Sequence, residues 1–326
     1  MHPVVRHAVS GFRRARHHLI ESDCMPELPE VESAIDLLRA RALGRTITRV
    51  RLLHPALMRR LSPARLRTLR GARIDRVERR GKHQLLHLGD GRVLHVHFRM
   101  NGDWEAGRRG DEMPRFARAV IEFDDDTQLA LVDSRALGTM ELHAAGADLA
   151  LGLGPDAADD TWTAAQLRTA LAVRRGPIKP ALLDQRLVAG LGNIYAAEAL
   201  WRARIDPRAS SRALGVARVA ALRRAVAFVI RRATGSRYTD DDTVSLDVYD
   251  REGEPCRRCG TAIERIVQAG RSTYFCPSCQ SDDDAVRVAA MGRAATKHVA
   301  KKRVARKRVA RKPVAKQPVA KPRDRR

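Results

Sequence analysis

The sequence predicts an α+β protein, in which an N-terminal helix and a β-sandwich precede a helical domain that ends in a small four-cysteine zinc hairpin. Three observations lead to this prediction. Segments of alternating apolar and polar residues recur between about residues 46 and 145, the apolar period becomes helical after Pro155, and two C-x-x-C pairs follow the helical half. A chain of 326 residues, 44% of them hydrophobic, can bury a core in each of two domains.

The first element is expected to be a helix that begins at Pro26. Apolar residues recur at helical spacing from 31 to 42, and Gly44 is typical of a helix end. The opening PELPEVES places a proline and two acidic residues in the first turn, where both favour a helix start. By itself this segment indicates only an ordinary helix N-terminus.

The next stretch predicts a β-sandwich or barrel. Turn residues at 89–91 and 124–126 separate short segments of strand-like alternation. The expected strands are TITRVRLL, GARIDRVERR, HQLLHLGD, VLHVHFRM, ARAVIEFD, QLALVDS and TMELH. Together with the first helix they define an N-terminal domain over 25–145.

The second half predicts a helical bundle over 155–240. Its expected helices are TAAQLRTALAVRR, PALLDQRL, GNIYAAEALWRARI and ALGVARVAALRRAVAFVIRRAT. The Gly-Leu-Gly-Asn turn at 190–193 opens the third of them, and backbone N–H groups at such a helix start can hold a phosphate.

A cysteine module over 245–280 follows. Two C-x-x-C pairs, with sixteen residues between them, let four thiolates surround one ion on a hairpin; they are Cys256, Cys259, Cys276 and Cys279. Four thiolate ligands close the coordination shell, so we expect one structural zinc ion rather than four unligated thiols. Cys24 stands alone, and no hydrophobic secretory segment precedes it, which favours an intracellular chain.

The charge of the chain indicates a polyanionic partner. The formal net charge is +24, and the sequence pI is near 11.1. Nucleic acid is the first expectation and an anionic membrane surface a distant second. No stretch approaches the roughly 18 apolar residues of a membrane span, so a membrane protein is not expected.

Both ends of the chain differ in composition from the domains between them. The segment 282–326 is repetitive and Pro-interrupted, and it is expected to be a disordered nucleic-acid-binding arm, the alternative being a tail that only adds solubility. Residues 1–24 are a basic extension, expected to be a start assigned too far upstream or a processed segment, because Met25 and Pro26 form a second plausible beginning.

The motifs taken together resemble one family. PELPEVES, the lysine in RRGKHQLL, HFRMNG, DSRALG, IKPALLDQ-x4-GLGNIYAAEAL and the zinc hairpin occur in the order found in the formamidopyrimidine-DNA glycosylase and endonuclease VIII family. The resemblance covers residues 25–280, and the PELPEVE form is closer to the formamidopyrimidine branch. It implies a helix–two-turns–helix domain and a base-excision repair glycosylase with AP-lyase activity that removes oxidised bases, with oxidised purines expected first.

The resemblance implies four catalytic residues. Pro26 matches the nucleophile that forms a Schiff base with the sugar, and Glu27 matches the general acid and base, with Glu30 lining the same site. Lys82 matches the lysine that assists β-elimination, and Arg271 matches the hairpin arginine that grips phosphate and serves δ-elimination. The proline nitrogen is nucleophilic only as a free terminal amine, so the extension 1–24 conflicts with this chemistry.

The resemblance also implies DNA contacts. Arg174, Lys179, Asn193 and Tyr249 match phosphate-contacting positions. Met100 and Arg135 match two residues that fill the gap left by a flipped base, and Leu137 stands where the family usually has Phe. Further departures are Phe116 in place of a common His, and a short stretch at 235–254 before the hairpin.

The expected partner is damaged double-stranded DNA, bound by a cytoplasmic, nucleoid-associated monomer that uses no nucleotide cofactor. Three alternatives stay open. The chain could be an endonuclease VIII-like enzyme for oxidised pyrimidines, or a non-catalytic zinc-containing DNA-binding protein. A membrane-surface protein would leave the zinc hairpin unexplained.

Overall fold

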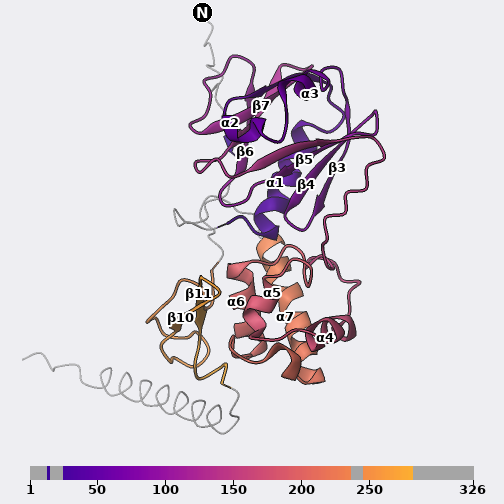
Figure 1. The fold of residues 1–326 in the computed structure, drawn as a ribbon. Coiled ribbons are helices and arrows are strands. Elements are labelled where there is room, and N and C mark those ends of the chain that lie inside the picture. The colour runs from indigo at the N-terminus through magenta and orange to yellow at the C-terminus, as the bar shows by residue number, and fades with distance from the viewer. Residues whose placement is uncertain (1–12, 15–24, 236–244, 282–326) are drawn as a thin grey trace, which may run out of the picture.

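The computed structural model describes residues 13–14, 25–235 and 245–281, and it has two domains with a small hairpin module beside the second (Figure 1). The expected disorder of 282–326 lies outside the described residues, as do most of the extension 1–24 and residues 236–244 of the stretch before the hairpin. None of the described helices is both long and apolar enough to cross a membrane.

The first domain is a sandwich of two antiparallel sheets. One sheet has the order β1-β6-β8-β7-β2 and the other β3-β4-β5-β9. The strands are β1 (Arg13–Arg14), β2 (Ile47–Leu52), β3 (Ile74–Arg80), β4 (His83–Leu88), β5 (Val93–His97), β6 (Asp103–Arg108), β7 (Ala117–Phe123), β8 (Thr127–Val132) and β9 (Thr139–His143). The predicted sandwich is therefore confirmed, and β1 adds two residues of the extension to its edge, with Arg13 opposite Ala106.

Besides β1, three elements of this domain were not expected from the sequence. Strand β6 contains Asp, Glu and Gly, which disfavour strands, yet its backbone pairs with β8 over the whole segment and buries Trp104 completely. Two short helices follow β2, α2 (Pro55–Met58) and α3 (Pro63–Arg67); His54 and Ser62 cap them with side-chain acceptors. Tertiary pairing and local capping, rather than periodicity, make these elements.

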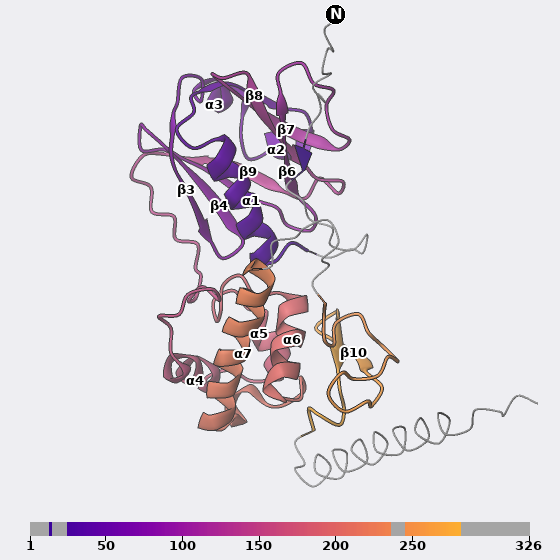
Figure 2. The same ribbon diagram turned by 180° about the vertical axis from the view of Figure 1, so that it is seen from behind.

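Helix α1 (Leu28–Arg41) connects the two hydrophobic cores. Val31, Ile35 and Leu38 pack into the core of the sandwich, whereas Leu28 belongs to the core of the helical domain. Figures 1 and 2 place the N-terminal end of this helix at the junction of the domains. The residues that immediately precede α1 therefore lie where the domains meet.

The helical domain contains α4 (Ala164–Ala172), α5 (Ile178–Leu182), α6 (Asn193–Ala203) and α7 (Val216–Gly235), with a short 3-10 helix at Ser211–Ala213. Thr163 begins α4 with a capping box to Gln166. Helix α6 is buried along most of its length, and it packs mainly against α7. This arrangement fixes the position of the N-terminus of α6.

The hairpin module consists of β10 (Glu264–Gln268) and β11 (Arg271–Phe275), with Gln268 opposite Arg271 at the turn. The module packs against α6 through Trp201, which shares a small core with the cysteines. Gln280 ties the end of the module to the helical domain, because its side-chain amide donates to the carbonyl of Ile205 at 2.8 Å. The module is thus attached both to α6 and to the segment that follows it.

Candidate active site and DNA-binding surface

The turn at 190–193 is shaped for close contact with α1. The N–H of Leu28 donates to the carbonyl of Gly190 at 3.1 Å. Gly190 has φ +91, and a Cβ there would lie 2.5 Å from Leu28 Cδ1. A Cβ on Gly192 would lie 2.5 Å from Glu27 Oε1. Both glycines are therefore required by the approach of the first domain.

The carboxylate of Glu27 occupies the N-terminus of α6. Its Oε1 accepts from the N–H of Ile194 at 2.8 Å, and its Oε2 accepts from the N–H of Tyr195 at 3.3 Å. The side chain is only 1% exposed. The sequence suggested that these N–H groups could bind phosphate; in the structure the first-turn donors at 194 and 195 bind a carboxylate of the protein instead, which is the same preference of a helix N-terminus for an anion.

Glu30 lines the same site, one turn along α1. Its Oε2 accepts from the N–H of Glu27 at 2.9 Å, and its Oε1 lies 2.9 Å from the hydroxyl of Tyr195. Burial, with the nearby charge of Glu27, raises the pKa of Glu30 to about 7. Burial also raises the pKa of Glu27, although the charge of Lys82 and the N–H donors of α6 oppose the shift. Glu30 can therefore hold and release a proton near neutral pH, and Glu27 holds its proton to a higher pH than an exposed carboxyl group does.

Lys82 lies on the turn between β3 and β4, close enough to Glu27 for their charges to interact, and only 6% of it is exposed. The preceding Gly81 adopts φ 57, and its N–H donates to Asp156 at 2.9 Å. Arg79 binds both oxygens of the same carboxylate, at 2.6 and 3.1 Å. Asp156, which no sequence motif identified, therefore holds the turn that carries the lysine. Pro26 is half-buried immediately before Glu27.

Lys179 and Asn193 join the helical domain to the hairpin. The ammonium of Lys179 donates to Asn193 Oδ1 at 2.6 Å, to the carbonyl of Ser272 at 2.9 Å and to Thr273 Oγ1 at 2.7 Å. These three bonds use all three of its donors, and the side chain is 1% exposed. Burial lowers the pKa of Lys179 to about 8, and the charge of Arg271 acts in the same direction.

The remaining predicted phosphate contacts differ in exposure. Arg271 is exposed at the turn of the hairpin. Tyr249 is half-buried; its hydroxyl accepts from Asn193 Nδ2 at 3.4 Å, and its ring packs edge-on against Tyr274. Arg174 forms an ion pair with Asp184 at 2.6 Å. The structure thus gathers Lys179, Asn193 and Tyr249 beside the hairpin.

The predicted gap-filling residues lie on loops of the sandwich. The loop after β8 is pinned by the buried Asp133, whose oxygens accept from the N–H of Arg135 at 3.0 Å and of Gly138 at 2.7 Å. Arg135 and Leu137 are exposed on this loop, Leu137 by 47%. Nearby, Phe116 is 40% exposed, and its carbonyl accepts from the N–H of Asp133. Met100 is half-buried in the turn after β5.

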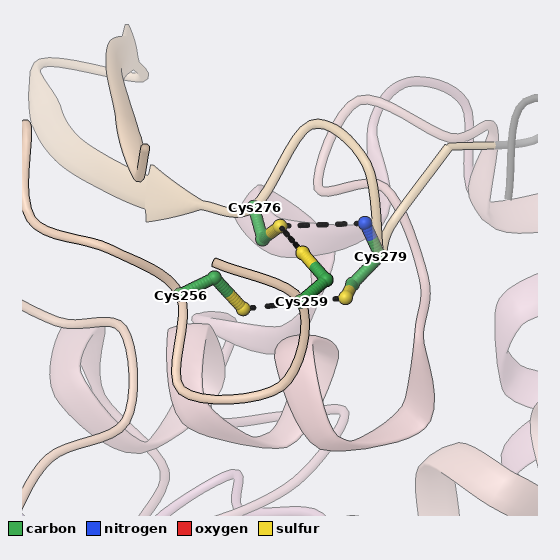
Figure 3. A group of neighbouring side chains, drawn as sticks. All are labelled: Cys256, Cys259, Cys276 and Cys279. Atoms are coloured by element: carbon green, nitrogen blue, oxygen red, sulfur yellow. Dashed lines mark hydrogen bonds between the residues drawn. The ribbon is translucent and has the colours of Figure 1, made fainter. Parts of the chain in front are cut away.

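The four cysteines converge at the base of the hairpin (Figure 3). Their sulfur atoms all lie within 4.8 Å of one another, with Cys259 and Cys276 at 3.4 Å and Cys256 and Cys279 at 4.0 Å. Tetrahedral zinc–thiolate bonds of about 2.3 Å place sulfur atoms about 3.8 Å apart. The cysteines therefore fit one structural zinc ion, as the spacing predicted, and Trp201 Nε1 donates to Cys256 Sγ at 3.4 Å.

The fold and site define a class: a β-sandwich joined through buried carboxyl groups to a helix–two-turns–helix domain with a zinc finger. Three family models match in the same order. They are the formamidopyrimidine-DNA glycosylase N-terminal domain at 25–140, the formamidopyrimidine-DNA glycosylase H2TH domain at 153–242, and the zinc finger found in FPG and IleRS at 253–281.

Whole-length relatives agree with these models. Formamidopyrimidine-DNA glycosylase of Paracoccus denitrificans is 41% identical and matches over 78% of this chain and 100% of its own. That of Symbiobacterium thermophilum is 40% identical, over 81% of this chain and 92% of its own. The chain belongs to the formamidopyrimidine-DNA glycosylase family.

Solved structures show the same fold. The complex of Lactococcus lactis FPG (MutM) with DNA containing FAPY-dG has a TM-score of 0.73 and 32% identity, and it covers 78% of this chain and 100% of that one. The complex of the same protein with DNA containing an oxidised pyrimidine has a TM-score of 0.74 and 32% identity, over 79% and 100%. The predicted family and fold class are confirmed.

Proposed function

We propose that this protein is a base-excision repair DNA glycosylase with AP-lyase activity, which removes oxidised purines, formamidopyrimidines among them, from double-stranded DNA. The relatives with this name and the complexes with damaged DNA support the proposal. One observation carries it: directly after Pro26, Glu27 is buried against the N-terminus of α6, with Lys82 close enough to interact with its charge. An amine, a proton-transfer group and a cation thus meet at one place.

The first step is displacement of the damaged base. The nitrogen of Pro26, as a free secondary amine, forms a bond to C1′ of the sugar, and the base leaves with the electrons of its glycosidic bond and takes up a proton. The proline nitrogen then gives up its own proton, and its lone pair opens the C1′–O4′ bond while O4′ is protonated, which leaves an iminium ion between the proline and C1′. Glu27 is placed to give and take these protons, because burial keeps its pKa above the usual range.

The later steps cut the strand. Loss of a proton from C2′ expels the 3′ phosphate, and a second elimination expels the 5′ phosphate. We assign the assistance of the first elimination to Lys82, and the grip on the phosphate during the second to Arg271, which is exposed at the tip of the hairpin. The zinc ion has a structural role, since four thiolates leave no open position on it.

We assign the other predicted residues to DNA binding. Arg135 and Leu137 are exposed and can enter the gap left by the flipped nucleotide, and we assign the half-buried Met100 to the same role. Asn193, Tyr249 and Arg174 are assigned to the phosphate backbone. Lys179 has all its donors in use, so we assign it to the support of Asn193 and the hairpin, with any phosphate contact requiring one of these bonds to open.

At the level of the whole chain, we assign catalysis to 25–145 and DNA binding to 155–240 together with the zinc module 245–280. The protein is proposed to act as a monomer in the cytoplasm, on the chromosome. The basic segment 282–326 is proposed to add affinity for DNA that falls with salt, because each neutralised phosphate releases counterions.

The proposal is tested by trapping the covalent intermediate. Borohydride reduces an iminium ion to a stable amine, so protein that begins at Pro26 should become linked to DNA carrying an abasic site. Protein that keeps residues 1–25 has an amide at this nitrogen, so it should bind the same DNA without trapping. If the form that begins at Pro26 binds the duplex and yields no adduct, the chain is a non-catalytic DNA-binding protein.

The choice of lesion is tested separately. A related enzyme has been solved with an oxidised pyrimidine as well as with FAPY-dG, so the fold alone accommodates both. Single-turnover excision from duplexes that differ only in the lesion should be faster for formamidopyrimidine than for an oxidised pyrimidine. The reverse order would place this chain with enzymes of the endonuclease VIII type.

A further inference from the structure

A cluster of histidines lies on the outer face of the four-stranded sheet. His95 on β5 stands opposite Glu141 on β9, and His143 follows two residues later on the same face. The alternate residues of these strands, among them Met140 and Leu142, point into the core of the sandwich. His83, at the start of β4, joins the cluster from the neighbouring strand.

The distances in the cluster suit a metal ion. His95 Nδ1 and His143 Nε2 are 3.2 Å apart, and one ring nitrogen of each histidine and one carboxylate oxygen of Glu141 all lie within 4.8 Å of one another. Two imidazole nitrogens bound to one tetrahedral ion at about 2.05 Å would be about 3.3 Å apart. Apart from the cysteines of the finger, this is the one group of its kind among the residues that the structure describes.

The hydrogen bonding of the cluster fits the same interpretation. If Nδ1 of His95 binds an ion, its proton must be on Nε2, and Nε2 lies 2.8 Å from His83 Nδ1. A histidine ligand usually donates its other N–H to an acceptor that fixes its orientation, and Nδ1 of His83 is placed to be that acceptor.

We propose that His95, Glu141 and His143 form a second metal site, which binds one divalent transition-metal ion of the zinc class. Two imidazoles and a carboxylate suit such ions better than magnesium or calcium, which prefer oxygen ligands alone. Three protein ligands leave a position for water, so this site differs from the closed four-thiolate site of the finger. His83 acts as the positioning residue behind His95.

Two cations face the site and limit its affinity. Arg60 donates to Glu141 Oε1 at 2.5 Å, and the charge of Arg99 also acts on His95 and His83. The bond from Arg60 leaves the second carboxylate oxygen of Glu141 for the ion. Because two positive charges oppose the incoming cation, we expect weaker binding than at the finger, so that chelators remove this ion first.

The experiment uses the full chain with its finger zinc in place. Zn²⁺ is titrated calorimetrically at pH 7.5 into protein that carries one zinc per chain by atomic emission. The wild type should bind one further ion at this site. Glu141→Gln, His95→Ala and His143→Ala should each weaken that binding at least tenfold, and His83→Ala should weaken it about tenfold through the loss of the positioning contact.

A matched control separates this site from other histidines. His87 lies on β4 of the same sheet but bonds to Glu78, so His87→Ala should leave the second binding event unchanged. Thermal unfolding without added metal shows whether each variant is folded, and Glu141→Gln keeps the shape of the site. Absence of a second ion in the wild type overturns the proposal, as does a second ion whose affinity is the same in His143→Ala or falls equally in His87→Ala. Neither result depends on glycosylase activity.

Discussion

The junction of the domains and the loop 133–138 hold their functional residues in opposite ways. At the junction, Glu27 and Glu30 are buried, and donors from the second domain fix their carboxyl groups. In the loop, the fixed and buried residue is Asp133, whereas Arg135 and Leu137 are exposed. The first region buries the functional groups themselves, and the second buries the residue that holds the backbone carrying them.

The difference follows from what each region has to do. Proton transfer needs carboxyl groups whose pKa values lie near the working pH, and burial produces such a shift. Entry into a DNA duplex needs side chains that are exposed at the surface. Substitutions at the junction should therefore strongly alter stability and catalysis. Substitutions on the loop should leave stability unchanged and alter only the step in which the loop side chains fill the gap in the DNA.

The largest expected effect is a change in how stability depends on pH. Burial raises the pKa of Glu30 to about 7 from an ordinary value of 4.5, so between these values the folded protein keeps a proton that the unfolded chain has lost. That proton stabilises the fold in acid, and the stabilisation disappears as the pH rises through 7. Glu30→Gln does not titrate, so its free energy of unfolding relative to wild type should rise by roughly 3 kcal/mol between pH 4.5 and 8, at about 1.4 kcal/mol per pKa unit.

Urea unfolding of both proteins across this pH range checks the prediction. The exposed Glu112→Gln serves as a control, and its difference from wild type should stay constant with pH. A constant difference for Glu30→Gln as well would show that the junction does not perturb this carboxyl group, and the contrast between the two regions would fail.

The second prediction tests the position of the Glu27 carboxylate by adding one methyl group at Gly192. In Gly192→Ala the new Cβ would lie 2.5 Å from Glu27 Oε1, so the carboxylate has to leave the N–H groups of α6. Misplacement of a catalytic group by about 1 Å costs about 100-fold in rate. Single-turnover excision should fall by that factor, while DNA binding stays within a few-fold of wild type.

Gly215→Ala is the matched control, because a Cβ at that position meets no atom within 4 Å. It should leave the excision rate unchanged. Equal rates for both alanine variants would mean that the position of Glu27 does not matter for the chemistry.

The smallest effect is expected on the loop. Leu137→Ala removes an exposed side chain, so the free energy of unfolding should change by less than about 0.5 kcal/mol. Excision should slow by several-fold, because less apolar bulk enters the gap, and Leu137→Phe should restore or raise the rate through stacking. Rates and thermal midpoints measured on the same samples check this. A marked loss of stability in Leu137→Ala would show that the loop is part of the core after all.

Sequence reasoning succeeded where spacing alone determines the result. The two C-x-x-C pairs predicted the cluster of four sulfur atoms, because a spacing of two residues holds the two thiols of each pair close together. The glycines at 190 and 192 indicated a tight turn, but not that α1 approaches it. Strand β6 was missed, because Trp104 and its neighbours join the sheet through backbone pairing that leaves no periodic signal.

Contacts between distant segments could not be predicted. Glu27 and Ile194 are 167 positions apart, and Lys179 is 93 positions from Ser272, so no local pattern joins them. Asp156 likewise acts only through the turn that carries Lys82. The histidine cluster shows the same limit, since each residue occupies an ordinary outward position on its own strand.

The bond from the N–H of Ile194 to Glu27 has a consequence for motion. The acid belongs to one domain and its donors to the other, so its affinity for a proton depends on the angle between them. If bending of DNA rotates the helical domain away, the carboxylate loses both the burial that raises its pKa and the N–H donors that lower it, so its acidity changes with the angle between the domains. Proton transfer by Glu27 and closure of the two domains on DNA would then be linked through the N–H groups of Ile194 and Tyr195. The two domains, if separated, could not reproduce the acidity that Glu27 has in the whole protein.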